Sequence, residues 1–358
     1  MNRRSIIWNH PESKQNSPSI NHNFRRPPVK STASRRNLKL RTIKSNQVLP
    51  DSFVWHPESL TEVRDQGQCG SCWAFAITSV MADRIFIQSN GMINVPLSPQ
   101  HLINCSSYPD QGPCEGNDVG YALSNIPKDG LISEKVRPYL MIEGGDQTHD
   151  CNIETSETEY EVQIPSQSTY CLTTNNIQDN IENMKAHIYH EGPIIGVMLT
   201  VYPDLSNYSG TDIYEPAPGQ DSEGGHAIEI IGWGKNNEGI SYWICRNSWG
   251  PQWPSNHLEG MGKGWFYVKM GSNTCRMEEF AYATVPKMVN QLNTSSNGQT
   301  DAYYNSPGIS EDPSYNPSYT VTVSHGNNLR KLINITILIG LIVLSYKGIM
   351  HLSKRKND

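Results

Sequence analysis

Residues 66–75 read QGQCGSCWAF, and an apolar pattern with a helical period follows from them. The pattern predicts a helix that begins near Cys72, after the Gly-Ser opening. A cysteine at a helix start lies where unpaired N–H groups and the helix dipole favour negative charge. Such a place favours the thiolate, which is the nucleophilic form. By pattern alone, Cys69 and Cys72 could instead be a redox or metal-binding pair.

Two further motifs lie downstream, GGHAI at residues 224–228 and RNSWG at residues 246–250. The first places His226 at the head of a strand, with glycines that allow close backbone approach. In the second, Asn247 can orient an imidazole by a side-chain hydrogen bond, and Trp249 can keep water off it. Together with Cys72 they predict a nucleophile, its proton partner and an orienting group.

Periodicity places helices early and strands late in the body of the chain. A second helix is expected over 177–190, ending at Glu-Gly-Pro. Strands are expected over 194–201, 226–233, 242–246 and 265–270, between glycine and proline punctuation. This order predicts an α+β protein with two lobes.

The three motifs, in this order, resemble the papain family of cysteine proteases, whose local signature includes Cys-Gly-Ser-Cys-Trp. The resemblance covers about residues 48–288 and is nearest the cathepsin B and cathepsin X branches. It implies a two-lobed papain-like α+β fold, with a helical lobe, a β-barrel-like lobe and an active cleft between them. It also implies a cysteine-type peptidase that acts on peptides or proteins without a metal or organic cofactor. Gln66 matches the family's oxyanion-hole glutamine, which would act with the Cys72 N–H.

The resemblance further implies a substrate-binding set, Gly116, Asn117, Phe280 and Trp249. Asn117 stands where the family usually has a second glycine close to the substrate backbone. Phe280 is expected to floor the second specificity pocket, whereas a slip of one residue would put Glu279 there and favour arginine. Neither the adjacent histidines of cathepsin B nor the insertion of cathepsin X is present in the sequence, which favours endopeptidase action.

Eight cysteines are too few for a disulfide-built miniprotein and fit a large domain with a few bridges. By resemblance, Cys69 pairs with Cys114 and Cys105 pairs with Cys151. The three that remain are Cys171, Cys245 and Cys275. Of these, Cys245 lies in a core-like strand and is expected to be a buried free thiol.

Charge divides the chain into four zones. Residues 1–47 carry +10 and are expected to be a propeptide-like or disordered head, with a possible anionic partner such as nucleic acid or lipid. Residues 48–288 are the expected protease domain and 289–329 a polar linker, together −21. The start of the mature enzyme is expected near Leu49. Residues 330–358 carry +5.

The C-terminal zone contains an apolar stretch, 332–346, with no charged residue and basic flanks. We expect a single membrane span here, which contacts the lipid bilayer and anchors the protein. The expected disulfides favour an oxidising compartment or a virion for the protease domain. Two alternatives stay open: a membrane-tethered, catalytically weak binding protein on the same scaffold, and a nucleic-acid binder through the head.

Overall fold

The computed structural model describes residues 38–45, 47–56, 60–89, 91–107, 112–127, 130–140, 151, 160–163, 168–256, 263–291 and 319–325. Its helices are α1 (Cys72–Gln88), α2 (Pro99–Ser106), α3 (Val119–Ser124), α4 (Ile177–Glu191), α5 (Pro203–Ser206) and a 3-10 helix, η5 (Thr274–Glu279). Its strands are β1 (Lys39–Ser45), β2 (Phe53–Val54), β3 (Leu131–Ile132), β4 (Tyr160–Gln163), β5 (Thr169–Cys171), β6 (Ile194–Val201), β7 (Ile213–Tyr214), β8 (Gly224–Lys235), β9 (Ser241–Arg246), β10 (Trp265–Lys269), β11 (Ala281–Thr284), β12 (Lys287–Gln291) and β13 (Tyr319–His325).

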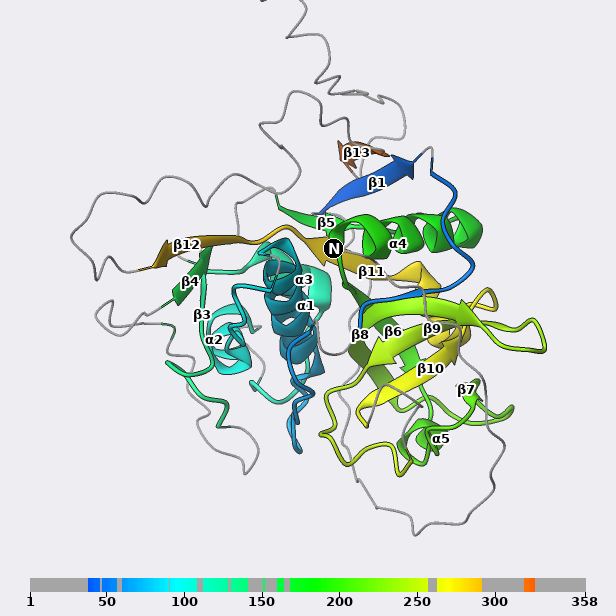
Figure 1. Cartoon of the computed structure of the whole chain (residues 1–358). Coiled ribbons are helices and arrows are strands. Elements are labelled where there is room, and N and C mark those ends of the chain that lie inside the picture. The colour runs from blue at the N-terminus through cyan, green and yellow to red at the C-terminus, as the bar shows by residue number, and fades with distance from the viewer. Residues whose placement is uncertain are drawn as a thin grey trace, which may run out of the picture.

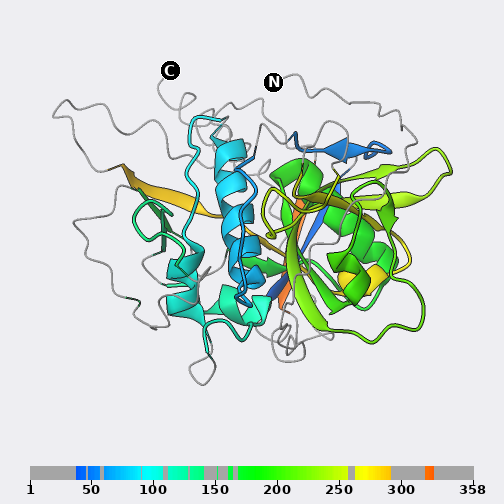
Figure 2. The same ribbon diagram turned by 90° about the horizontal axis from the view of Figure 1, so that it is seen from below.

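The predicted helices and strands are present, α1 and α4 among the helices and β6, β8, β9 and β10 among the strands. They form two lobes, as Figures 1 and 2 show. On one side lie α1, α2 and α3 with the three-stranded sheet β12-β4-β3, and on the other lies the large sheet with α4 and α5. Helix α1 is buried continuously from Trp73 to Ile85. A helix buried all round belongs in a core, and α1 packs between its own lobe and the face of the large sheet.

The large sheet has ten strands, paired in the order β13-β1-β5-β11-β6-β8-β9-β10-β7, with β2 added on β8. Most neighbours are antiparallel, and β1–β5 and β10–β7 are parallel. The sheet is long and curled, and no pairing joins its two ends within the described residues. The second lobe was expected to resemble a β-barrel; among the described residues its sheet is open, because the first and last strands of the order are not paired.

The structure differs from the predicted division of the chain at β1 and β13. Strand β1 lies in the expected basic head and β13 in the expected polar linker, yet they pair along seven residues. Strand β1 also joins β5 of the protease body. Leu38 and Ile43 are buried. The last residues of the head are thus part of the sheet, because their backbone groups and two apolar side chains find partners there.

Strand β1 is held on α4 by polar contacts as well as by pairing. Arg41 forms an ion pair with Glu191 at the end of α4, and its guanidinium lies 4.8 Å from the ring centre of Tyr170. The Asn183 side chain accepts from Ile43 N at 3.0 Å and donates to Arg41 O at 2.8 Å. A basic strand can lie here because a buried carboxylate faces it.

The other predictions about the two ends concern residues 1–37 and the apolar stretch 332–346, and both lie outside the described residues. Within the part of the chain that is described, no helix combines the length and the apolar character that crossing a membrane requires.

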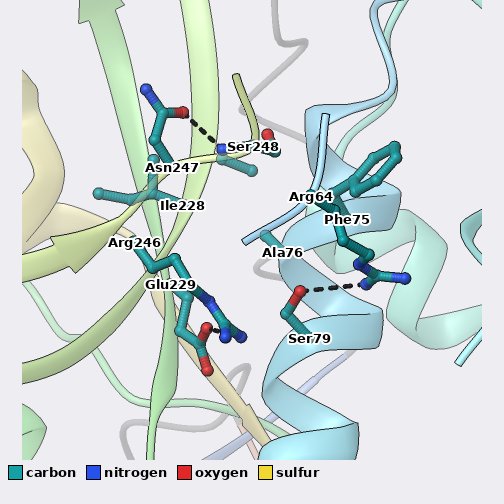
Figure 3. A pocket seen from close by; sticks show the side chains of 10 residues that line it. Arg64, Phe75, Ala76, Ser79, Ile228, Glu229, Arg246, Asn247 and Ser248 are labelled. Atoms are coloured by element: carbon teal, nitrogen blue, oxygen red, sulfur yellow. Dashed lines mark hydrogen bonds and ion pairs between the residues drawn. The ribbon is translucent and has the colours of Figure 1, made fainter. Parts of the chain in front are cut away.

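Buried charges join the two lobes behind the cleft. Asp83 of α1 forms an ion pair with Arg246 of β9 at 2.6 Å and accepts from Thr61. Arg246 also pairs with Glu229 of β8. Figure 3 shows a small cavity beside this cluster, with Arg246 and Glu229 on the sheet side and Ser79 of α1 opposite. Because Asp83 and Arg246 belong to different lobes, their ion pair fixes one lobe against the other.

A second polar contact joins α1 to the large sheet. The Arg84 side chain is fully buried and donates to the backbone carbonyls of Gly192, Pro193 and Thr284. It also forms an ion pair with Glu191 at 3.5 Å. Two adjacent residues of α1 therefore contact different parts of the second lobe: Asp83 contacts β9, and Arg84 contacts the segment between α4 and β6 and the end of β11.

The Glu229 carboxyl is the excess acid in this cluster, since Asp83 already balances Arg246. Burial raises its pKa well above the ordinary value, and although Arg246 opposes this, the neighbouring Asp83 adds to it. A carboxyl whose folded pKa is raised favours the folded state below its unfolded pKa of about 4.5, and this contribution is lost as the pH rises.

We therefore expect Glu229→Gln to become more stable relative to the parent chain as the pH increases from 4 to 8. Glutamine keeps the shape of the neutral carboxyl and takes up no proton on folding, so the pH-dependent loss disappears. Thermal unfolding of both proteins across this range measures the effect. A difference in Tm that is constant with pH, or that grows toward pH 4, would contradict it.

Candidate active site

Cys72 is the first residue of α1 and contacts β8 of the other lobe through its sulfur. The preceding Ser71 does not cap the helix with its side chain. The disulfide between Cys69 and Cys114 ties down the loop before it, and Gly70 N donates to Cys114 O at 3.0 Å. Cys72 is a free cysteine and is half-buried, so the residue keeps some exposure to solvent. The local sequence thus places a thiol at a fixed helix start.

His226 lies in β8, and Asn247 directly follows β9, the adjacent antiparallel strand. The register pairs Glu229 with Arg246, so His226 and Asn247 lie toward the same end of the two strands. The His226 Nε2–H donates to Asn247 Oδ1 at 2.8 Å. In this tautomer the other ring nitrogen, Nδ1, carries no proton, which is the state that a proton acceptor needs.

The structure brings the two halves of the site together across the lobe boundary. Ala227 N donates to Cys72 Sγ at 3.4 Å, so the residue directly after His226 touches the nucleophile. Both His226 and Asn247 are buried. A thiol, an imidazole and an orienting amide therefore form one group, drawn from α1, β8 and the end of β9.

Trp249 lies against His226, with ring centres 4.9 Å apart and planes tilted by 33°. It also stacks edge-on with Trp253 at 5.0 Å. Only 4% of Trp249 is exposed. The structure thus places this residue as a cover on the imidazole, which is the role that the RNSWG motif predicted, and its place in the substrate-binding set stays a prediction.

Gln66 is buried beside the nucleophile loop. Its amide donates from Nε2 to Cys69 O at 2.9 Å, and its Oε1 accepts from the Ser248 hydroxyl at 2.6 Å. The backbone of Gln66 also donates to Ser248 O at 2.8 Å. The side-chain N–H groups are therefore held close to the start of α1, where a donor to an oxyanion is needed.

Gly116 and Asn117 follow the disulfide-bonded Cys114, near the nucleophile loop. Gly116 has a φ of +89°, which favours glycine. The Asn117 side chain donates to Ser106 O at 2.7 Å and accepts from Asp118 N at 2.9 Å. Both ends of this amide are bound within the helical lobe. The side chain that replaces the usual second glycine is therefore held against the end of α2.

Phe280 and Glu279 have different surroundings. Phe280 belongs to the apolar cluster that also contains Ala227, next to His226. The Glu279 carboxylate accepts from Arg276 at 2.7 and 3.0 Å and from Asn273 at 2.8 Å. The aromatic ring is therefore part of the apolar core at the lobe boundary, whereas the acid is already paired.

The structure contains the two disulfides that the resemblance implied, Cys69–Cys114 and Cys105–Cys151. Cys171, Cys245 and Cys275 are free and buried. The prediction of a buried free thiol at Cys245 is confirmed, and burial raises its pKa well above the ordinary value. Burial also raises the pKa of Cys275 to about 12, so neither thiol competes as a nucleophile.

One group of potential metal ligands occurs among the described residues, His101, Cys105 and Cys151, whose ligand atoms lie within 4.8 Å of one another. Both cysteines are joined in a disulfide, so no thiolate is available there. Burial, with a smaller effect of Arg137, lowers the pKa of His101 to about 4. Its Nδ1 accepts from Ile132 N at 3.4 Å. The group is therefore best explained as packing beside a disulfide.

Two polar residues at the site were missed from the sequence. Ser248 orients Gln66 through its hydroxyl. Tyr139 donates its hydroxyl to Gln66 O at 2.7 Å. Ser248 lies inside the RNSWG motif and could have been singled out there. Nothing in the pattern around Tyr139 points to the site, since it is more than sixty residues from both Gln66 and Cys72.

Known proteins share this arrangement of sequence and fold. Residues 49–285 match the family described as papain family cysteine protease. Cathepsin B-like cysteine proteinase 4 of Caenorhabditis elegans is 31% identical over 252 residues, which cover 64% of this chain and 72% of the relative. Cathepsin B-like CP2 of Giardia intestinalis is 30% identical over 249 residues, covering 68% and 76%.

A solved structure, procathepsin B S9 from Trypanosoma congolense, is similar to this chain with a TM-score of 0.55 and 27% identity. The similarity covers 75% of this chain and 85% of that one. The residues that match the family model include the thiol, the imidazole and the amide described above. The chain therefore belongs to the papain family of cysteine proteases, near cathepsin B.

Proposed function

We propose that this protein is a cysteine-type endopeptidase, made as a precursor, in which Cys72 is the nucleophile and His226 its proton partner. The observation that carries the assignment is a pair of contacts: Ala227 N, directly after His226, donates to Cys72 Sγ, and the His226 ring donates to Asn247. Asn247 orients the imidazole, and Gln66 with the Cys72 N–H forms the oxyanion hole. The absence of adjacent histidines from the sequence supports action within a chain rather than at its end.

The chemistry follows from these roles. The Cys72 thiolate attacks the scissile carbonyl carbon, and the carbonyl oxygen becomes an oxyanion that Gln66 and the backbone N–H stabilise. The imidazolium of His226 gives its proton to the leaving amine as the C–N bond breaks. Water then attacks the thioester while His226 takes its proton, and Cys72 is released with the carboxylic acid product.

Replacing the nucleophile tests the assignment. The full chain, assayed on fluorogenic dipeptide substrates before and after limited proteolysis of the head, should lose all turnover on Cys72→Ser, because the alcohol is far less ionised than the thiol. An epoxide thiol-protease inhibitor should label the parent chain at Cys72 and leave the variant unlabelled. Cys245→Ser serves as the matched control and should keep activity.

The competing assignment is a binding protein that keeps the scaffold without effective catalysis. It predicts no turnover and no labelling of Cys72 in a parent chain whose unfolding is cooperative. The paired His226 and Asn247 favour the enzyme, since a binding surface needs no oriented imidazole.

We propose that the second specificity pocket has an apolar aromatic floor at Phe280. The pairing of Glu279 with Arg276 supports this, because a neutralised carboxylate has little left to offer an arginine side chain.

Substrates with phenylalanine at the second position should therefore be cleaved with higher kcat/KM than those with arginine. Phe280→Glu should shift the ratio toward arginine, whereas Glu279→Ala should leave it nearly unchanged. Initial rates on the two dipeptide substrates measure the ratio. A strong arginine preference in the parent chain that Glu279→Ala abolishes would assign the floor to Glu279.

We also propose a membrane anchor through 332–346, with the protease domain in an oxidising compartment or virion. The uncharged stretch with basic flanks and the two disulfides support it. The full chain should float with lipid vesicles on a density gradient at high salt, and a chain that ends at Leu329 should stay at the bottom. Flotation of both chains that salt abolishes would point to the basic head instead.

A further inference from the structure

Tyr139 lies on the loop after β3, in the helical lobe, and is held by one contact at its backbone and one at its ring. Its backbone N–H donates to the Glu134 carboxylate at 2.8 Å. The ring stacks edge-on against Phe75 of α1, with centres 4.8 Å apart. The Arg64 guanidinium packs on Phe75, 5.1 Å from the centre of that ring. Glu134 and Phe75 therefore place the phenol.

The hydroxyl of Tyr139 bridges the two ends of the loop before the nucleophile. It donates to Gln66 O at 2.7 Å, and the Ser71 hydroxyl lies 2.7 Å away and can donate to it in turn. Gln66 opens this loop, and Ser71 closes it directly before Cys72. The two groups proposed to stabilise the oxyanion are the Gln66 amide and the Cys72 N–H, so one phenol contacts the chain beside each of them.

The middle of this loop is held by the Cys69–Cys114 disulfide and by the bond from Gly70 N to Cys114 O, whereas the Tyr139 hydroxyl contacts its two ends. Gly67 has a φ of +59°, so the chain turns immediately after Gln66. The Gln66 side chain is oriented by the Ser248 hydroxyl from the other lobe. The carbonyl of the same residue is oriented by Tyr139. Burial raises the pKa of Tyr139, which keeps its proton in place for this bond.

We propose that Tyr139 is a positioning residue for the oxyanion hole, whose hydroxyl sets the spacing between the Gln66 amide and the Cys72 N–H. The inference rests on the proposed function of these two groups. Tyr139 itself does not touch the substrate; it acts through the loop. Misplacement of a catalytic group by about 1 Å can cost on the order of 100-fold in rate.

Tyr139→Phe keeps the stacked ring and removes only the bridge. We expect kcat to fall by about tenfold to 100-fold with little change in KM. Tyr214→Phe is the matched control, because it also removes a buried hydroxyl bond, to Asp204 at 2.7 Å, but at the far edge of the sheet. It should leave kcat unchanged. Inhibitor titration of Cys72 counts the folded sites in each protein.

A double-mutant cycle separates positioning from general destabilisation. If Tyr139 acts through Gln66, then Tyr139→Phe added to Gln66→Ala should cost less than about twofold more, since there is no longer an amide to place. If the two losses multiply, or if Tyr139→Phe leaves kcat intact, the inference is wrong. Should Tyr139→Phe fail to fold, Ser71→Ala removes the other half of the bridge and must show the same non-additivity. An inactive and unlabelled parent chain would instead mean that the proposed function has failed.

Discussion

The ion pair between Asp83 and Arg246 is the contact on which the site geometry depends. Cys72 comes from α1 and Asn247 from the end of β9, so catalysis requires that the two lobes keep their register. Asp83 lies about three turns along the same helix as Cys72, and Arg246 directly precedes Asn247. A buried pair of this kind often adds little net stability. The pair instead fixes the relative position of the lobes, because a displacement of one lobe would leave two buried charges without their partners.

The catalytic residues could be predicted because each lies in a short run whose neighbours already specify an element. Glycine and serine open α1 before Cys72, and glycines lead into β8 before His226. That these runs act together was predicted from the chemistry of the three residue types and from the family resemblance. Their details, such as the contact of Ala227 N with the sulfur, depend on lobe packing, which no local pattern encodes.

Side-chain direction explains the differences at the cleft. Trp249 was expected both to keep water off the imidazole and to contact substrate, and Asn117 to stand where substrate backbone passes. Trp249 covers His226 as expected but is almost fully buried, and Asn117 bonds to Ser106. Each side chain is aimed by a partner distant in sequence or on another element. A residue type and a spacing indicate that a position is near the site, but the partner determines which way the side chain points. Strand β1 was not predicted for a related reason. Its basic composition is typical of a solvated segment, and its partners, Glu191 and β13, lie far away in the sequence.

Contacts made by hydroxyl groups were likewise not predictable from the sequence. Gln66 is oriented by Ser248 and Tyr139, which belong to different lobes, and hydroxyl bonds leave no periodic trace in a sequence. An oxyanion hole works because its donors are in place before charge develops, so that nothing has to reorganise during the reaction. In this protein the Gln66 donor is held in place by a hydrogen bond to its side-chain amide from Ser248 and one to its backbone carbonyl from Tyr139. The groups that touch the reacting atoms could be found by motif, whereas the groups that hold them still become visible only when the chain is folded.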